Sequence, residues 1–214
     1  MITAAARNNA EWCDALCRTH GIAGQFGMDF WSSSRRTPPY YPDAVTLSAT
    51  ATPDEILAAV DSGAGSSVKD SFARLDLTEH GFRVLFDAEW ITLPITQGDP
   101  QWTLVRDAVE LAEWESAWGG DGSLFRPELL ADKRIAILGE RRGDHIVAGC
   151  IANESGPVVG LSNLFGDDAW AGAVATIGHY FPDKPIVGYE HGESLEAALQ
   201  QGFQSIGPLR IWAR

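Results

Sequence analysis

The sequence predicts an α+β protein, in which a mixed, mostly antiparallel sheet is flanked by helices. Two observations predict this class. The second half contains three apolar runs separated by short glycine-containing turns, followed by alternating helical and apolar segments. The 214 residues are 45% hydrophobic and 21% charged, which is an ordinary globular composition and enough chain for one large or two small domains.

The charge of the chain disfavours several partners. Sixteen basic and 29 acidic residues leave a formal net charge of −13, so we expect no binding to nucleic acid. No apolar run approaches the roughly 18 residues of a membrane span, and the first residues contain no apolar signal segment. With three cysteines, these features lead us to expect a cytoplasmic protein without membrane contact, and a homodimer is compatible with them.

The first half is predicted to begin with a helix over residues 6–20, which Gly21 ends. Three prolines make residues 31–43 a loop, and residues 45–47 form a short strand. Thr52 then caps a helix of about ten residues that has Pro53 at its first position.

Residues 68–77 and 82–93 are predicted to pair as a β-hairpin, with the turn at residues 79–81. Residues 94–101 contain two prolines and a glycine, and we interpret them as a linker. This divides the chain into an N-terminal helix and hairpin half-domain, residues 1–100, and a second domain, residues 101–214. The first half could be a truncated version of the second, packed against it.

The second half is predicted to contain a strand at 102–107, a helix at 108–119 and a helical turn at 127–132. Three antiparallel strands follow at 135–138, 145–153 and 158–164. The remaining elements alternate: a helix at 167–181, a strand at 185–190, a helix at 193–203 ended by Gly202, and a strand at 208–213.

This order resembles that of the GNAT N-acetyltransferase superfamily over residues 101–214. The segment GYEHGESLEAALQQGF, followed by GPLRIWA, is similar to the closing strand, helix and strand of that family. The resemblance implies an acyltransferase that uses acetyl-CoA or another acyl-CoA to acylate a small molecule. It also implies a coenzyme A site at the junction before the helix at 167–181, with Leu164, Gly166 and Gly172 as its cofactor-binding residues.

The chain departs from the family pattern at two points. The junction lacks the family's arginine and carries Asp167 and Asp168, which suit the start of a helix and would repel a diphosphate. Ala198 stands where the family often has a tyrosine that acts as the general acid. A non-catalytic, GNAT-derived protein that binds a small anion or has a regulatory role is therefore an alternative, as is an enzyme of another reaction class in the same cleft.

Polar residues interrupt the middle of the predicted sheet. In the family that the chain resembles, the fourth and fifth strands separate and the two substrates meet between them. We therefore expect a site between the corresponding strands of this chain. Polar side chains within an apolar strand need partners or line a cavity, and a bulge satisfied by the backbone is the alternative. The candidates are Glu190, Glu154 and Tyr189 for catalysis and Asn153, Ser162 and Asn163 for substrate binding.

Cationic and aromatic residues gather in the proline-rich loop and after it, in a chain that is otherwise acidic. They could bind an anionic small molecule, or they could pack on the domain with their charges solvated or paired. The residues are Trp31, Arg35, Arg36, Tyr40, Tyr41 and Lys69.

Two further patterns contain groups that could bind or react. Asp87 and Glu89 share one face of a predicted strand, where they could form an acid and base pair of raised pKa, bind a substrate amine or simply face solvent. Cys13, Cys17 and His20 share a helix face, but no fourth ligand is evident and buried cysteines are far commoner, so we expect no metal site.

Overall fold

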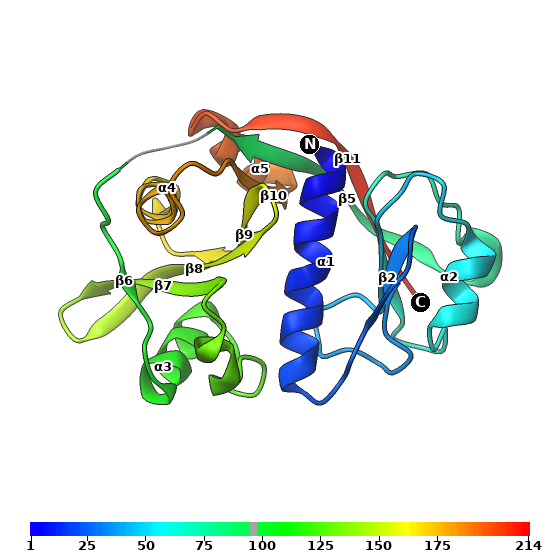
Figure 1. The fold of residues 1–214 in the computed structure, drawn as a ribbon, viewed down its shortest axis with the longest axis horizontal. Helices are drawn as coiled ribbons and strands as arrows, with labels where there is room; N and C mark the ends of the chain where they lie inside the picture. The colour runs from blue at the N-terminus through cyan, green and yellow to red at the C-terminus, as the bar shows by residue number, and fades with distance from the viewer. Residues whose placement is uncertain (95–97) are drawn as a thin grey trace.

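A computed structural model describes residues 1–94 and 98–214, and part of the predicted linker at 94–101 lies outside these ranges. The described residues form one 11-stranded sheet with helices on both faces (Figure 1). The order of strands is β1-β2-β3-β4-β11-β5-β10-β9-β8-β7-β6. The predicted α+β class, with a mixed and mostly antiparallel sheet, is confirmed.

The elements follow the predicted order closely. The helices are α1 (Ile2–Thr19), α2 (Pro53–Ala59), η1 (Thr78–His80), α3 (Ala108–Trp118), η2 (Pro127–Ala131), α4 (Ala169–Tyr180) and α5 (Gly192–Gln200). The strands of the first half are β1 (Gln25–Phe26), β2 (Phe30–Ser32), β3 (Ala44–Thr46), β4 (Ser67–Asp70) and β5 (Arg83–Leu93). Those of the second half are β6 (Thr103–Leu104), β7 (Ile135–Arg142), β8 (His145–Ser155), β9 (Val158–Phe165), β10 (Ile186–Glu190) and β11 (Gln204–Ala213).

The two faces of the sheet are covered by different helices. On β7 and β8, Ile137 and Ile151 pack in one cluster with residues of α1 and α3. The alternate residues Leu138 and Cys150 pack in another cluster with residues of α4 and α5. Because successive side chains of a strand point to opposite faces, α1 and α3 cover one face and α4 and α5 cover the other.

The helix α1 is fixed to the sheet by a reciprocal pair of amides. Asn8 Nδ2 donates to the carbonyl of Asn153 at 2.9 Å, and Asn153 Nδ2 donates to the carbonyl of Asn8 at 3.2 Å.

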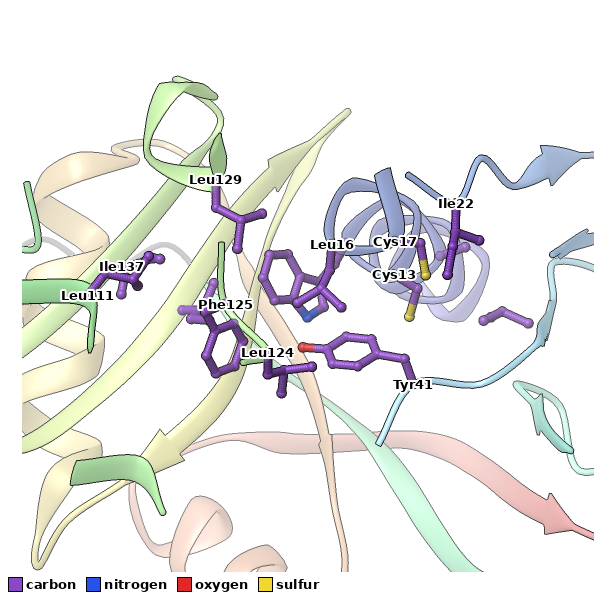
Figure 2. Close-up of a cluster of buried hydrophobic side chains, with 14 of the residues drawn as sticks. Cys13, Leu16, Cys17, Ile22, Tyr41, Leu111, Leu124, Phe125, Leu129 and Ile137 are labelled. Carbon is purple, nitrogen blue, oxygen red and sulfur yellow. The ribbon is translucent and has the colours of Figure 1, made fainter. Parts of the chain in front are cut away.

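Further along α1, Figure 2 shows the Cys13 sulfur on the side of the helix that faces Tyr41. Both cysteines of the helix, Cys13 and Cys17, are buried in this apolar cluster, as expected for structural thiols.

The predicted hairpin of residues 68–77 with 82–93 is wrong. The strand β11 lies between β4 and β5 and is antiparallel to both. The chain leaves the sheet after β4 because the Asp70 carboxylate accepts hydrogen bonds from the backbone N–H groups of Phe72 and Leu75. The apolar side chains of Leu75 and Leu77, which resembled strand alternation, pack instead in a cluster with α2.

The strand β5 joins the two halves of the chain into one sheet. It belongs to the first 100 residues, yet it pairs with β11 on one edge and with β10 on the other. Strands from residues 1–100 and from residues 101–214 therefore lie side by side in the centre of one sheet.

The strands β9 and β10 are parallel and pair over only two positions, Ile186 with Val159 and Val187 with Gly160. Both continue beyond this point, to Phe165 and to Glu190. The pairing of β9 with β8 is also shifted between Ser162 and Phe165, and Asn163 has a φ of +54° there. This irregularity is a β-bulge, which bends a strand and redirects its side chains.

Candidate functional site

A cavity of about 290 Å³ lies where β9 and β10 stop pairing, on the face of the sheet that α1 covers. We call it the α1 cavity. The helix α1, the loop at 40–42 and strands β4, β5, β9 and β10 all contribute to it. It is lined by Asn9, Trp12, Cys13, Tyr40, Tyr41, Pro42, Lys69, Phe86, Leu161, Ser162, Asn163, Leu164, Tyr189, Glu190 and His191.

A second cavity, of about 540 Å³, lies on the face of the sheet that α4 and α5 cover. We call it the α4 cavity. It follows the end of β9, the loop into α4 and one side of α5. It is lined by Leu164, Phe165, Gly166, Asp167, Asp168, Ala169, Trp170, Ala171, Glu190, Ser194, Ala197, Gln200 and Gln201.

The two cavities meet at the opening between β9 and β10. Leu164 and Glu190 line both of them. Because one cavity contacts α1 and the other contacts α4 and α5, a molecule on one face of the sheet can reach a molecule on the other face there. This arrangement suits a reaction between two substrates that bind separately.

Glu190 is partly buried at this opening. In the described part of the chain its carboxylate has neither an ion pair within 4 Å nor a side-chain hydrogen bond. Burial disfavours the charged form and raises the pKa of Glu190 to about 7. A carboxyl group with this pKa can accept a proton near neutral pH.

Two hydroxyl groups of the α1 cavity are buried without a partner. Neither Ser162 Oγ nor Tyr41 Oη makes a hydrogen bond of ordinary geometry to any described residue. Burial also raises the pKa of Tyr41 well above its ordinary value, so this hydroxyl keeps its proton and remains a donor. Buried polar groups of this kind need a partner, and a polar ligand in the cavity would supply one.

Lys69 brings the one ammonium group among the residues that line the α1 cavity. Its Nζ donates to Asn9 Oδ1 at 2.8 Å and lies 4.1 Å from the centre of the Tyr189 ring. The Lys69 side chain is almost completely buried. Tyr189 thus packs against Lys69, and its ring also meets Trp90 edge to face.

The loop between β9 and α4 leaves the start of α4 uncapped by a side chain. Asp168 occupies the N-cap position with a φ of +54° and makes no side-chain cap hydrogen bond. Gly166 has a φ of +102°, and a Cβ there would lie 2.4 Å from the Ala148 Cβ. Gly172 lies in the helix itself, where a Cβ would meet the Trp102 ring at 2.4 Å.

The cationic residues of the proline-rich loop are not brought together with Lys69. Arg36 is bound to the Asp43 carboxylate and to backbone carbonyls, and it does not line the α1 cavity. Arg35 is exposed and donates to the carbonyl of Gly21. Trp31 is a core residue whose indole N–H donates to Asp14, whereas Tyr40 does line the cavity.

The acidic candidates of β5 face solvent. Asp87 forms an ion pair of 2.6 Å with Arg210 on the neighbouring strand, and Arg210 lowers the pKa of Asp87. Glu89 accepts a hydrogen bond from the Ser205 hydroxyl. Neither residue lines the α1 or the α4 cavity.

Two of the central candidates have structural partners instead. Asn153 belongs to the amide pair that holds α1. Glu154 forms an ion pair of 2.6 Å with Lys184 and lines neither cavity. The sequence reasoning therefore placed Ser162, Asn163, Tyr189 and Glu190 at one point, as the structure does, but added residues that lie outside it.

Sequence reasoning missed several wall residues, of which Asn9 is the most informative. It is a polar residue one helical turn before Cys13, on the side of α1 that faces the sheet. A polar side chain on a helix face of buried residues was the available signal. The contribution of α5 to the α4 cavity had no such signal, because Ser194, Ala197 and Gln200 are ordinary helix residues.

A search for metal ligands among the described residues finds no group of three or more His, Cys, Asp or Glu side chains placed to bind an ion. No described helix has the length and apolar character that a membrane crossing requires.

Comparison with solved structures relates nearly the whole chain to GNAT acetyltransferases. A putative acetyltransferase of the GNAT family from Novosphingobium aromaticivorans matches with a TM-score of 0.58 at 8% identity, over 98% of both chains. A GCN5-related N-acetyltransferase from Kribbella flavida matches with a TM-score of 0.61 at 13% identity, over 97% of this chain and 94% of that one. A Drosophila protein matches with a TM-score of 0.56 at 13% identity, over 96% and 88%.

The chain has the GNAT fold. No protein-family model matches the sequence, and no match to a curated protein is found. The resemblance noted over residues 101–214 is therefore confirmed as a likeness of fold, and it extends to the first half as well.

Proposed function

We propose that the protein is an acyl-CoA-dependent N-acyltransferase that acts on a small-molecule amine. One observation carries the proposal: an unpaired glutamate, Glu190, lines the opening at which cavities on opposite faces of the sheet meet. In this proposal the acyl donor occupies the α4 cavity and the amine occupies the α1 cavity.

The opening between β9 and β10 suits the arm of an acyl thioester. The backbone of Gly188–Glu190 has no strand partner on the β9 side, so its polar groups are available to a ligand that lies between the strands. An acyl thioester supplies the activated acyl group. The other residues of the opening orient it and exclude water.

The side chains of the α1 cavity can manage the protons and the charge of acyl transfer. Glu190 is the proposed base, because its pKa of about 7 lets it take the proton that the amine loses. Ser162 Oγ and Tyr41 Oη line the α1 cavity as free donors among the described residues, and either can stabilise negative charge on the acyl oxygen.

The far end of the α4 cavity supports the proposal less strongly. The first N–H groups of α4 carry no side-chain cap, so they are free to bind an anion. However, Asp167 and Asp168 are exposed beside them, and the described residues that line the α4 cavity include no arginine. A diphosphate would bind there against the repulsion of two carboxylates.

The first experiment is titration with acetyl-CoA and with coenzyme A by calorimetry. We expect a Kd in the micromolar range, which corresponds to a binding free energy of about −8 kcal/mol. A screen of amines for acetyl transfer follows, with release of the thiol as the readout. Glu190→Gln is expected to lower kcat by about 10²- to 10⁴-fold, whereas Glu154→Gln should leave it unchanged. No binding up to about 1 mM would overturn the proposal.

A second candidate is a non-catalytic protein that binds a small anion. Three departures from the family pattern favour it: the absence of the family's arginine at the junction, the adjacent residues Asp167 and Asp168, and Ala198. The buried ammonium of Lys69 favours it as well. Such a protein would bind small anions in the α1 cavity without measurable affinity for coenzyme A.

A further inference from the structure

We propose that the molecule bound in the α1 cavity carries a carboxylate as well as an amine, so that the acyl acceptor is a small amino acid. In this arrangement Lys69 binds the carboxylate and the amine lies toward Glu190. The assignment of the amine rests on the proposed function, whereas the assignment of the carboxylate rests on the groups that line the cavity, chiefly Lys69.

The ammonium of Lys69 is buried without a counter-charge. Its side chain is 4% exposed, yet no carboxylate of the described residues lies within 4 Å of Nζ. A lysine ammonium has three N–H donors, and one of them is used by Asn9 Oδ1. Burying a charge is costly unless it is paired, so an anionic ligand would complete this site.

The carboxylate of Glu190 does not fill this role. Among the described residues, no ion pair within 4 Å joins it to Lys69. The neighbouring acid Asp70 is also occupied, because both its oxygens accept backbone N–H groups. The α1 cavity thus presents an unpaired cation and an unpaired carboxyl group that are not paired to each other.

The other free groups of the cavity fit a carboxylate as well. Tyr41 is 8% exposed, and its hydroxyl has no hydrogen-bond partner in the part of the chain that the structure describes. The hydroxyl of Ser162 is likewise buried without a hydrogen-bond partner among the described residues. Both can donate to a carboxylate oxygen, which accepts several hydrogen bonds. The ammonium and one of these hydroxyls form a site for a single negative charge, which leaves the other hydroxyl for the acyl oxygen.

The size of the cavity limits the acceptor. A volume of about 290 Å³ equals that of roughly ten water molecules in the liquid, so the ligand has on the order of ten non-hydrogen atoms. The aromatic walls formed by Trp12, Phe86 and Tyr189 suit an apolar side chain. A free amino acid with a small or medium apolar side chain meets these conditions.

The first test compares acceptors that differ in the carboxylate. Acetyl transfer from acetyl-CoA is measured for phenylalanine, phenylalaninamide and phenethylamine, and for leucine, leucinamide and isopentylamine. We expect kcat/KM to be at least tenfold higher for each amino acid than for its amide or amine. In Lys69→Met this preference should fall to about one, since methionine keeps the apolar contact with Tyr189 but has no charge.

The second test measures binding and does not depend on turnover. N-acetylleucine and N-acetylphenylalanine are titrated by calorimetry, each beside its amide, which lacks the negative charge. The native protein is expected to bind the acids at least tenfold more tightly than the amides, and Lys69→Met should bind both equally. Phosphoethanolamine is included in both tests as an amine with a different anion.

Lys133→Met is the matched control, because it removes an exposed lysine that lines neither cavity. The melting temperature of each variant shows whether it is folded. If Lys69→Met fails to fold, the comparison of acid with amide in the native protein still tests the carboxylate site, because equal binding of the two would overturn it.

The outcomes separate the two proposals. Binding of the acids without any acetyl transfer would support the carboxylate site and overturn the proposed acyltransferase. Transfer to amines without preference for the acid would overturn the carboxylate site and leave the acyltransferase. Preference for phosphoethanolamine over both amino acids would also overturn the assignment of a carboxylate.

Discussion

Glu190 shows how one buried carboxyl group lowers the stability of the folded protein. Its folded pKa of about 7 lies above the ordinary value of 4.5 because the fold withdraws it from water. Between these two pH values the folded state holds a proton that the unfolded state has released. The stability of the protein therefore falls as pH rises through this range and stays lower above it.

Glu190→Gln is expected to raise the melting temperature at pH 8. Glutamine has nearly the same shape and carries no charge to bury, so the cost of the carboxylate disappears. At pH 4 both side chains are neutral, and the difference should vanish. Thermal unfolding of the two proteins at both pH values measures this, with Glu154→Gln as the control. A lower melting temperature for Glu190→Gln at pH 8 would contradict the burial of an unpaired charge.

The same pKa predicts the pH dependence of the reaction. A general base must be deprotonated, so kcat is expected to rise with pH and level off above a midpoint near 7. The residual activity of Glu190→Gln should lack this limb. A midpoint near 4.5 in the native protein would show that the base is an exposed carboxyl group.

At the scale of residues, the sequence predicted those site residues that interrupt a pattern of their immediate neighbours. Ser162 and Asn163 break an apolar run, and this break marks the bulge where the cavities meet. The same reasoning grouped Lys69 with Arg35 and Arg36, because all three are cations near one another in the chain. It could not foresee that Asp43 binds Arg36 and leaves Lys69 alone, since such pairing depends on the folded geometry.

At the scale of elements, the helix α1 forms one wall of the α1 cavity and is held by few polar contacts. The side chains of Asn8 and Asn153 each donate to the backbone of the other element. The glycine at position 160 leaves room for them, because a Cβ there would lie 2.0 Å from Asn8 Oδ1. This contact sets the position of Asn9, which binds Lys69.

Asn8→Ala is expected to destabilise the protein by about 1–3 kcal/mol, because it removes a buried donor and leaves a carbonyl without its partner. Chemical unfolding measures the change. Glu11→Ala, in the partly exposed pair with Arg7 on the same helix, should cost less than about 1 kcal/mol. Equal effects of the two substitutions would show that the amide pair does not fix α1.

The elements themselves were mostly predictable, but their pairing was not. Strong periodicity and clear end signals gave the helices α3, α4 and α5 to within a few residues. The hairpin of residues 68–77 with 82–93 was mistaken because nothing local shows that a strand from the end of the chain lies between its arms. Pairing between distant segments depends on the whole fold and leaves little trace in either segment.

At the scale of the whole molecule, the central sheet unites the two halves that the sequence suggested. The strand β5 contributes backbone partners to both β10 and β11. Removing the first half would leave both edges of β11 and one edge of β10 unpaired, and it would expose the apolar surface that α1 covers. The division near residue 100 thus describes the order of the elements along the chain.

A fragment of residues 101–214 is therefore expected not to fold alone. Its thermal unfolding should show no cooperative transition, and it should aggregate at concentrations where the full chain is monodisperse. Adding residues 1–100 as a separate chain should restore a cooperative transition if the halves associate. A fragment that unfolds cooperatively by itself would contradict the dependence on β5.

The position of the opening between β9 and β10 also constrains the order of events in the proposed reaction. The two cavities lie on opposite faces and meet beside Leu164 and Glu190, so donor and acceptor can enter and leave without passing each other. The thiol of Cys13 is available to the acceptor side, but burial raises its pKa to about 11 and makes it a poor nucleophile at neutral pH. The acyl group would then pass directly between two molecules bound at once, and initial-rate plots for varied donor and acceptor would intersect rather than run parallel.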